Sequence, residues 1–209
     1  MGLRAVVFDY GMVLSGEPDA ETHAQMVRIT GLPVERFEIL YWADRLEYDR
    51  GALTGATFWQ KFVRDAGISL EPAAIEQLQR LDAVLWTTQN PAMLAWQMRL
   101  KERGLLTGIL SNMGEDVLTN IKKEFDWLPR FDVLVWSYQI NLVKPDPAIY
   151  KHLLKELRTR PEETLFLDDK LVNVRAARAL GIKALEFTTV EQLRRDLIAA
   201  GLDEQLPLP

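Results

Sequence analysis

Apolar runs of strand length recur along the chain and alternate, in its second half, with segments of helical spacing. The runs are bounded by polar, charged or glycine residues and lie at residues 5–8, 108–110, 133–136, 164–167 and 184–187. Apolar positions three and four apart predict helices at residues 93–103, 117–125, 148–157 and 171–180. Strands that alternate with helices indicate an α/β fold built on a doubly wound parallel sheet.

Residues 17–88 interrupt this alternation, because no run in this stretch has the pattern of a strand. Apolar residues instead recur at helical spacing, as at Phe37 and Tyr41. We therefore expect a core domain made of residues 1–16 and 89–209, split by an inserted helical domain of residues 17–88.

The composition narrows the classes of function. The chain has 209 residues, 48% of them hydrophobic, so it can bury one core and carry a modest second module. Its net charge of −5 comes from interspersed charges of both signs, which gives no basic surface for nucleic acid. The absence of cysteine excludes disulfides, thiolate metal sites and a cysteine nucleophile.

Two features of the sequence bear on location. A chain without cysteine suits a reducing compartment. The apolar stretch before Asp9 is too short for a signal peptide or a membrane span. We therefore expect a cytoplasmic protein that does not insert into a membrane, with residues 205–209 frayed at the chain end.

Polar clusters follow the predicted strands at the point where each strand ends or shortly beyond it. Because the carboxyl ends of parallel strands meet at one edge of the sheet, these clusters are expected to converge on one crevice. A single cluster of this kind is more often a turn or a helix cap. Four together indicate a site; they are Asp9, Ser111-Asn112, Lys144-Pro145-Asp146 and Asp168-Asp169.

Four segments carry a resemblance to a known family. The segments VVFDYGMVL, GILSNM, VKPDPAIY and FLDDKLVNVRAARALGI resemble the four ordered motifs of haloacid dehalogenase (HAD) superfamily hydrolases. The helical insertion sits where that family has a C1-type cap. The start FDxGxVL and the end FLDD…N are most similar to bacterial glucose-1-phosphate phosphatases and to the N-terminal phosphatase domain of soluble epoxide hydrolases. The resemblance implies a Rossmann-like core with a cap domain.

The resemblance also implies that an aspartate acts as the nucleophile and that the reaction depends on Mg²⁺. Asp9 would attack the phosphorus of a small phosphorylated metabolite, such as a sugar phosphate, and form an aspartyl-phosphate. Mg²⁺ prefers hard oxygen ligands and usually takes one or two protein carboxylates. Asp9, the backbone carbonyl of Gly11 and Asp169 would supply these ligands.

The remaining motif residues would hold the phosphoryl group and the catalytic lysine. Ser111 and the backbone N–H of Asn112 would bind the phosphoryl group. Lys144 would face both Asp9 and the transferring oxygens, with Asp168 accepting a charge-assisted hydrogen bond from it. Asn173 would orient Asp169 or a metal-bound water.

One position departs from the pattern of HAD phosphatases. These enzymes carry a second Asp two positions after the nucleophile as general acid and base, and Gly11 stands there in this chain. Three consequences compete: a phosphatase with a substitute acid or a good leaving group, a different chemistry, or a weakly active relative that serves as a binding scaffold. Only this position departs, which favours retained activity.

Two different chemistries share the same nucleophile. A 2-haloacid dehalogenase needs no metal, and crowding Asp168 and Asp169 against Asp9 without a cation would weaken the nucleophile. A phosphonoacetaldehyde hydrolase forms a Schiff base with a cap lysine. Lys61 is the sole lysine between residues 17 and 88, and its charged neighbours favour an exposed surface lysine.

The inserted segment is rich in Trp, Tyr and Arg, which could hold a sugar ring or a second anionic group. The residues concerned are Trp42, Arg45, Tyr48, Arg50 and Trp59. Trp42 and Trp59 fit the aromatic core of a helical bundle equally well. We expect the loop at residues 49–55 to face the active site, and a cap of this size to select small molecules over phosphoproteins.

Overall fold

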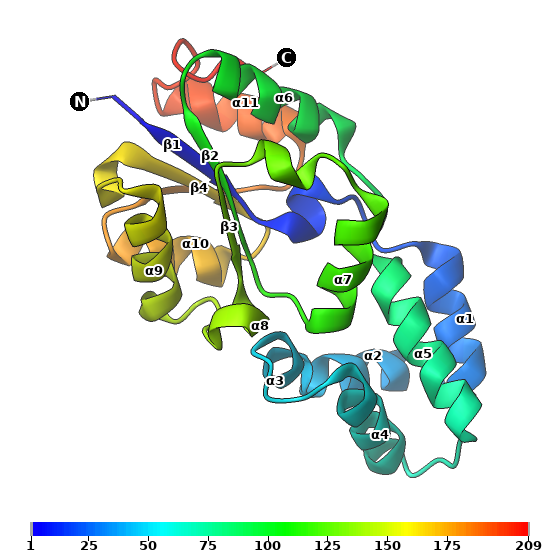
Figure 1. Ribbon diagram of the computed structural model, residues 1–209. Helices are drawn as coiled ribbons and strands as arrows, with labels where there is room; N and C mark the ends of the chain where they lie inside the picture. Colours follow the sequence, from blue (N-terminus) through cyan, green and yellow to red (C-terminus); the bar gives the residue numbers. More distant parts are fainter. Residues whose placement is uncertain (1, 209) are drawn as a thin grey trace.

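The computed structural model describes residues 2–208 and contains one parallel sheet of five strands (Figure 1). The strands are β1 (Ala5–Phe8), β2 (Leu106–Ser111), β3 (Val133–Trp136), β4 (Thr164–Asp168) and β5 (Lys183–Glu186). Their order across the sheet is β3-β2-β1-β4-β5. The first strand therefore lies at the centre, and connections run outward from it in both directions. This arrangement confirms the predicted doubly wound α/β fold.

Helices cover both faces of the sheet, as the alternation of buried strand residues requires. Ala5 and Val7 pack with apolar side chains of α9 (Pro147–Leu157) and α10 (Leu171–Ala179). Val6 and Phe8 share the opposite cluster with three further helices. These are α6 (Pro91–Glu102), α7 (Glu115–Glu124) and α11 (Val190–Ala199). Because β1 and β4 are buried on both faces, their sequences read as nearly continuous apolar runs, whereas the edge strand β5 begins at the exposed Lys183.

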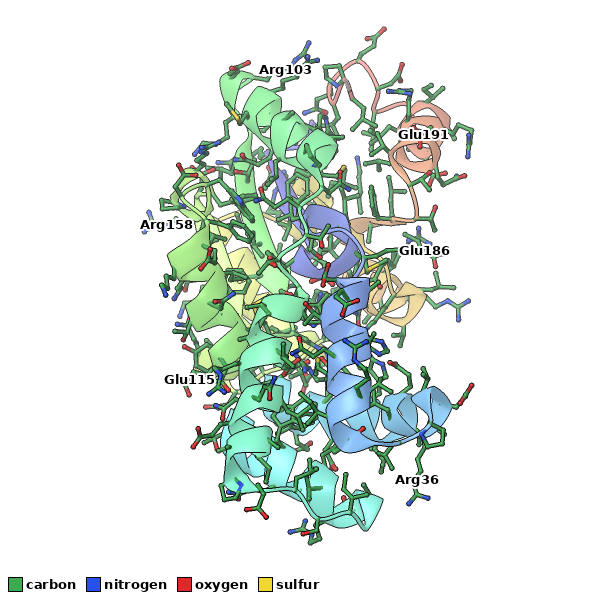
Figure 2. The ribbon with its side chains drawn as sticks, turned by 90° about the vertical axis from the view of Figure 1, so that its right-hand side faces the viewer. Arg36, Arg103, Glu115, Arg158, Glu186 and Glu191 are labelled. Atoms are coloured by element: carbon green, nitrogen blue, oxygen red, sulfur yellow. The ribbon has the colours of Figure 1, made fainter. Side chains whose placement is uncertain are left out.

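Five helices lie together beyond one end of the sheet and have a hydrophobic core of their own (Figure 1). They are α1 (Ala20–Thr30), α2 (Val34–Ala43), α3 (Arg45–Asp49), α4 (Gly55–Ala66) and α5 (Pro72–Leu85). Figure 2 shows the labelled Arg36 on this bundle and Arg103 at the opposite end of the molecule. The helical character expected for the insertion is therefore present. The domain boundaries at 17 and 88 stay a prediction.

The chain crosses between sheet and bundle twice, and the two crossings are paired with each other. Ser15 and Gln89 form an isolated antiparallel bridge. The Gly16 N–H donates to the Thr88 carbonyl at 2.9 Å, and the Asn90 N–H donates to the Leu14 carbonyl at 2.8 Å. The two connections thus form one short hydrogen-bonded ribbon.

The structure corrects the sequence analysis at several places. Strand β2 runs over Leu106–Ser111 and is longer than predicted, and helix α11 has no counterpart among the predicted elements. The tail was expected to fray, but the Gln205 side chain bonds both backbone groups of Leu3 and Leu206 is fully buried. Pro209, also part of that prediction, lies outside the described residues. Among residues 2–208, no helix has the length and apolar character needed to cross a membrane.

Candidate active site

Three neighbouring strands deliver the polar side chains to one edge of the sheet. Asp9 follows β1, Ser111 ends β2 and Asp168 ends β4. Phe8 is in register with Ile109 of β2 and with Leu167 of β4. The polar residues that follow these positions therefore lie at the same edge of the sheet. They border or lie directly beneath a pocket of about 590 Å³ that opens between the sheet and the bundle.

A buried lysine lies between two buried carboxylates. The Nζ atom of Lys144 is 2.8 Å from Oδ2 of Asp9 and 2.6 Å from Oδ2 of Asp168. Burial lowers the pKa of Lys144, but the charges of Asp168 and Asp9 outweigh this effect and hold that pKa above its usual value. The lysine is therefore cationic at the position where phosphoryl charge would develop.

Asp168 holds this lysine and has little capacity left for another ligand. Its Oδ1 accepts hydrogen bonds from the Lys170 N–H at 2.8 Å and from Nδ2 of Asn173 at 2.9 Å. Its Oδ2 accepts from Lys144 and, at 3.1 Å, from the same Asn173 amide. Asn173 thus contacts Asp168, whereas the sequence analysis associated it with Asp169 or a water.

The carboxylates form a cluster that suits a divalent cation. One oxygen each of Asp9, Asp168 and Asp169 lies within 4.8 Å of the others. Burial raises the pKa of Asp9 to about 7, against the opposing charge of Lys144 and with added repulsion from Asp168 and Asp169. A cation would remove this repulsion. Asp168 accepts from Lys144, Lys170 and Asn173 and is not among the pocket-lining residues, whereas Asp9, Asp169 and the Gly11 backbone border the pocket, so Asp9 and Asp169 are the carboxylates placed to bind the cation.

Asn112 is built into the site through its side chain. Its Nδ2 donates to the Lys144 carbonyl at 2.9 Å, and its Oδ1 accepts from the Lys144 N–H at 2.8 Å. The sequence analysis assigned only the backbone N–H of Asn112, as a phosphoryl ligand. The side chain has the additional effect of fixing the backbone of Lys144.

Gly11 leaves open space where related enzymes carry a carboxylate. Its φ of −61° and ψ of 133° are accessible to any residue, and a Cβ built on it meets nothing within 4 Å. The site therefore has no acid at this position and has room for one.

The bundle supplies the opposite wall of the pocket, and this wall is largely apolar. Trp42, Leu46 and Trp86 line it together with Arg45 and Asp49. Trp42 is 44% exposed, and the Nζ atom of Lys170 lies over its ring, 5.4 Å from the ring centre.

Only part of the predicted aromatic and Arg cluster reaches this wall. Trp42 and Arg45 do, whereas Tyr48 and Trp59 are buried inside the bundle. Arg50 lies elsewhere, and of the loop predicted to face the site only Asp49 borders the pocket. Helical spacing alone does not distinguish a pocket-facing residue from a bundle-core residue.

Arg45 is the centre of a buried ionic network in the bundle. Its Nη1 donates to both oxygens of Asp82, at 2.8 and 2.9 Å. The Tyr41 hydroxyl donates to the same Asp82 carboxylate at 2.6 Å. The Nε atom of Arg45 lies 3.2 Å from Oδ1 of Asp49. The guanidinium of Arg45 therefore contacts two carboxylates, those of Asp82 and Asp49.

Two close contacts hold the helical bundle against the loops at the edge of the sheet. The Tyr48 ring lies over Gly114, where a Cβ would come within 2.3 Å of the ring. The Ser137 hydroxyl donates to the Asp49 carbonyl and accepts from the Met113 N–H at 2.8 Å. The end of α3 is therefore fixed directly beside the loop that follows Ser111.

Lys61 lies away from the pocket lining, in agreement with a surface lysine. Its Nζ pairs with Asp44 at 2.6 Å and also with Asp65. Hydrogen bonds to Asp44 and Asp65 raise its pKa, so the amine is held as an ammonium ion. This state is unsuited to forming a Schiff base.

Curated proteins with similar sequences include two phosphatases. Phosphatase MT3486 of Mycobacterium tuberculosis is 29% identical, with 96% of this chain and 96% of that protein aligned. Sesquiterpene phosphatase astK of Aspergillus oryzae is 34% identical, with 88% and 90% aligned. (S)-2-haloacid dehalogenase 1 of a Pseudomonas species is 27% identical over 91% of this chain and 86% of that protein. The chain spans only 19% of another relative, acyl-CoA dehydrogenase family member 10 of Mus musculus, which is 28% identical over 94% of this chain.

Solved structures show the same fold. A HAD family enzyme of Bacteroides thetaiotaomicron, crystallised with magnesium and inorganic phosphate, superposes with a TM-score of 0.72 at 22% identity, covering 90% of this chain and 95% of that one. The expected superfamily is confirmed, whereas the subgroup stays a prediction. Since the family model for haloacid dehalogenase-like hydrolases matches residues 3–181, the chain belongs to that family of hydrolases.

Proposed function

We propose that the protein is a magnesium-dependent phosphatase that hydrolyses small phosphomonoesters through an aspartyl-phosphate on Asp9. The observation that carries this proposal is the buried Lys144 held between Asp9 and Asp168, with Asp169 completing a carboxylate cluster beside the pocket between sheet and bundle. The relatives named as phosphatases support it.

Each residue has a separate task in this proposal. Bound Mg²⁺, held by Asp9, Asp169 and the Gly11 carbonyl, would neutralise phosphoryl charge. The Asp9 carboxylate attacks phosphorus. Lys144 stabilises the charge that develops on the phosphoryl oxygens, and Ser111 and the Asn112 N–H bind those oxygens. Asp168 and Asn173 hold Lys144 in place through the hydrogen bonds described above.

The pocket wall bears on the class of substrate. Its bundle side is formed mainly by Trp42, Leu46 and Trp86, and of the two polar residues there, Arg45 is already bonded to Asp82. A sugar would need several polar partners there, whereas an apolar organic group needs none. We therefore favour phosphomonoesters whose organic part is at least partly apolar over sugar phosphates. The name of the relative astK, a sesquiterpene phosphatase, agrees with this choice.

The dehalogenase alternative has one relative in its favour. Against it stands the carboxylate cluster, because without a cation the Asp9 pKa of about 7 leaves much of the nucleophile protonated at neutral pH. A phosphonatase would need a cap lysine at the pocket, and Lys61 lies outside the pocket lining. Both alternatives are outcomes of the experiment below.

The experiment is a turnover screen over phosphomonoesters, phosphonates and 2-haloacids, with Mg²⁺ and with chelator. We expect phosphate release with Mg²⁺ alone, and its loss in Asp9→Asn, whose amide cannot form an acyl-phosphate. Asp146→Asn is the matched control, because Asp146 caps α9 through an acceptor oxygen that Asn retains. Chelator-resistant halide release would replace the phosphatase proposal with the dehalogenase.

A further inference from the structure

We propose that Asp49 of the bundle is the general acid and base of this enzyme, acting in place of the carboxylate that Gly11 lacks. This inference rests on the proposed phosphatase function. It starts from a chemical requirement: an alkoxide leaving group needs a proton, and the Gly11 position cannot give one.

The position of Asp49 matches the place where the proton is needed. In phosphoryl transfer the attacking and leaving oxygens lie roughly in line on opposite sides of phosphorus. Asp9 attacks from the sheet edge, so the leaving oxygen faces the bundle. Asp49 is a carboxylic acid of the bundle that borders the same pocket as Asp9 and Gly11.

The core of the protein fixes Asp49 in this position. Its carbonyl accepts the Ser137 hydroxyl, which in turn accepts the Met113 N–H. The next carbonyl, that of Arg50, accepts Nδ2 of Asn141 at 2.9 Å. These bonds join the end of α3 to loops of the sheet domain, so the carboxyl group is placed relative to Ser111 and not only relative to the bundle.

The charges around Asp49 favour a bound proton. Arg45 gives two hydrogen bonds to Asp82 and only a 3.2 Å contact to Asp49. The 3.2 Å contact joins Arg45 Nε to Oδ1 of Asp49 without hydrogen-bond geometry, and among the described residues no other donor bonds this buried oxygen. A buried group of one cation and two carboxylates has an excess negative charge, and a proton on the less well bound carboxylate removes it.

The same surroundings act on the pKa of Asp49. Burial raises this pKa, against Arg45 and Lys170, which lower it, while Asp82 raises it further. Arg45, Asp82 and Lys170 are the charged groups that act on it. A raised pKa is what a general acid near neutral pH requires.

The reaction balances with this single proton carrier. As the bond from Asp9 to phosphorus forms and the bond to the leaving oxygen breaks, the Asp49 proton moves to that oxygen and the alcohol departs. The Asp49 carboxylate then takes a proton from the water that attacks phosphorus. The products are inorganic phosphate, the free Asp9 carboxylate and protonated Asp49.

The test compares leaving groups in Asp49→Asn. For alkyl phosphates, whose leaving groups need protonation, we expect kcat/KM to fall by about 10²–10⁴-fold. For p-nitrophenyl phosphate we expect less than about a tenfold fall, because its leaving group needs little protonation. Asp44→Asn is the control, since Asp44 lies outside the pocket lining and pairs with Lys61. It should leave both values unchanged.

A second variant separates proton transfer from structure. Because a side chain at Gly11 meets open space, Gly11→Asp in the Asp49→Asn background should restore alkyl phosphate turnover at least tenfold more than p-nitrophenyl phosphate turnover. A purely structural defect would not be repaired in this selective way. Equal losses on both substrates without selective rescue, or no loss at all, overturn the role of Asp49.

The wild-type protein distinguishes this inference from the proposed function. Turnover of p-nitrophenyl phosphate with a trapped phospho-Asp9 supports the phosphatase, whatever Asp49 does. If that turnover is present and the leaving-group ratio is unchanged in Asp49→Asn, only the present inference fails. If the wild-type protein releases no phosphate from either substrate, both fail.

Discussion

Asn112 and Lys144 exchange two hydrogen bonds, one in each direction between the amide side chain and the lysine backbone. The two residues belong to segments that are 32 positions apart in the chain. Their pairing joins the loop after β2 to the loop that carries Lys144. In the proposed function, the residues that bind the phosphoryl group and the ammonium that neutralises its charge are therefore positioned as one unit.

Replacing Asn112 tests this pairing. We expect Asn112→Ala to lower the free energy of unfolding by about 1–3 kcal/mol, since it leaves two buried backbone groups without partners. It should also lower kcat more than it raises KM, because Lys144 is then misplaced at the transition state. Urea denaturation and steady-state kinetics measure the two effects. Asn120→Ala, which removes one hydrogen bond to Ala83, is the control and should leave kcat unchanged.

Magnesium binding should depend on pH. In the metal-free protein, burial raises the Asp9 pKa to about 7, so below pH 7 the metal must displace a proton. We therefore expect Mg²⁺ affinity to fall as the pH drops below 7 and to level off above it. Calorimetry in two buffers of different ionisation enthalpy should detect proton release near pH 6 and little near pH 8. Asp169→Asn should weaken binding at every pH, and a pH-independent affinity would contradict the ligand assignment.

Trp42 should contribute to binding of the organic group. Losing the contact between its ring and an apolar substrate should cost roughly 1.5 kcal/mol, which is about tenfold in KM. We expect Trp42→Ala to raise KM for naphthyl phosphate while leaving kcat nearly unchanged. Ile39→Ala on the same helix is the control, because Ile39 is 71% exposed and lies outside the pocket lining. A change in kcat alone would contradict the binding role.

The ionic network of the bundle should matter for stability. Asp82→Ala leaves the buried Arg45 with the Tyr41 hydroxyl and a 3.2 Å contact to Asp49 as its remaining polar partners, and breaking such a buried ion pair costs about 3–5 kcal/mol. We expect a loss of this size in the free energy of unfolding, measured by urea denaturation. Glu76→Ala on the same helix removes an exposed pair with Arg80 and should change stability little. Equal effects of the two variants would show that the network is not structural.

The sheet and its polar edge could be predicted because both follow from local rules. Buried parallel strands require continuous apolar runs, and their carboxyl ends must meet, so Asp9, Ser111 and Asp168 had to converge. The place of Lys144 opposite the carboxylates is implied by the resemblance to the family motif, and the structure brings all four residues together.

The finer contacts could not be predicted, because they depend on tertiary geometry. Asn173 is one helical turn from either neighbouring Asp, and only the orientation of α10 selects Asp168. Arg45 and Tyr48 lie three positions apart in the short helix α3, and the way this helix packs decides that Arg45 reaches the pocket while Tyr48 does not. Lys170 follows Asp169 directly, a signal that could have marked it as a lining residue.

The paired crossing at Ser15 and Gln89 limits how the two halves of the molecule can move. Two independent tethers would let the bundle translate and tilt in any direction within their length. A hydrogen-bonded ribbon resists sliding of one crossing past the other, so rotation about the ribbon is the motion that it leaves available once the Ser137 and Asn141 hydrogen bonds to the end of α3 open. Such a rotation would carry Trp42 and Asp49 away from Asp9 together. The contact of Trp42 with the organic group and the proton transfer from Asp49 would then depend on the same rotation. Neither would occur without the other.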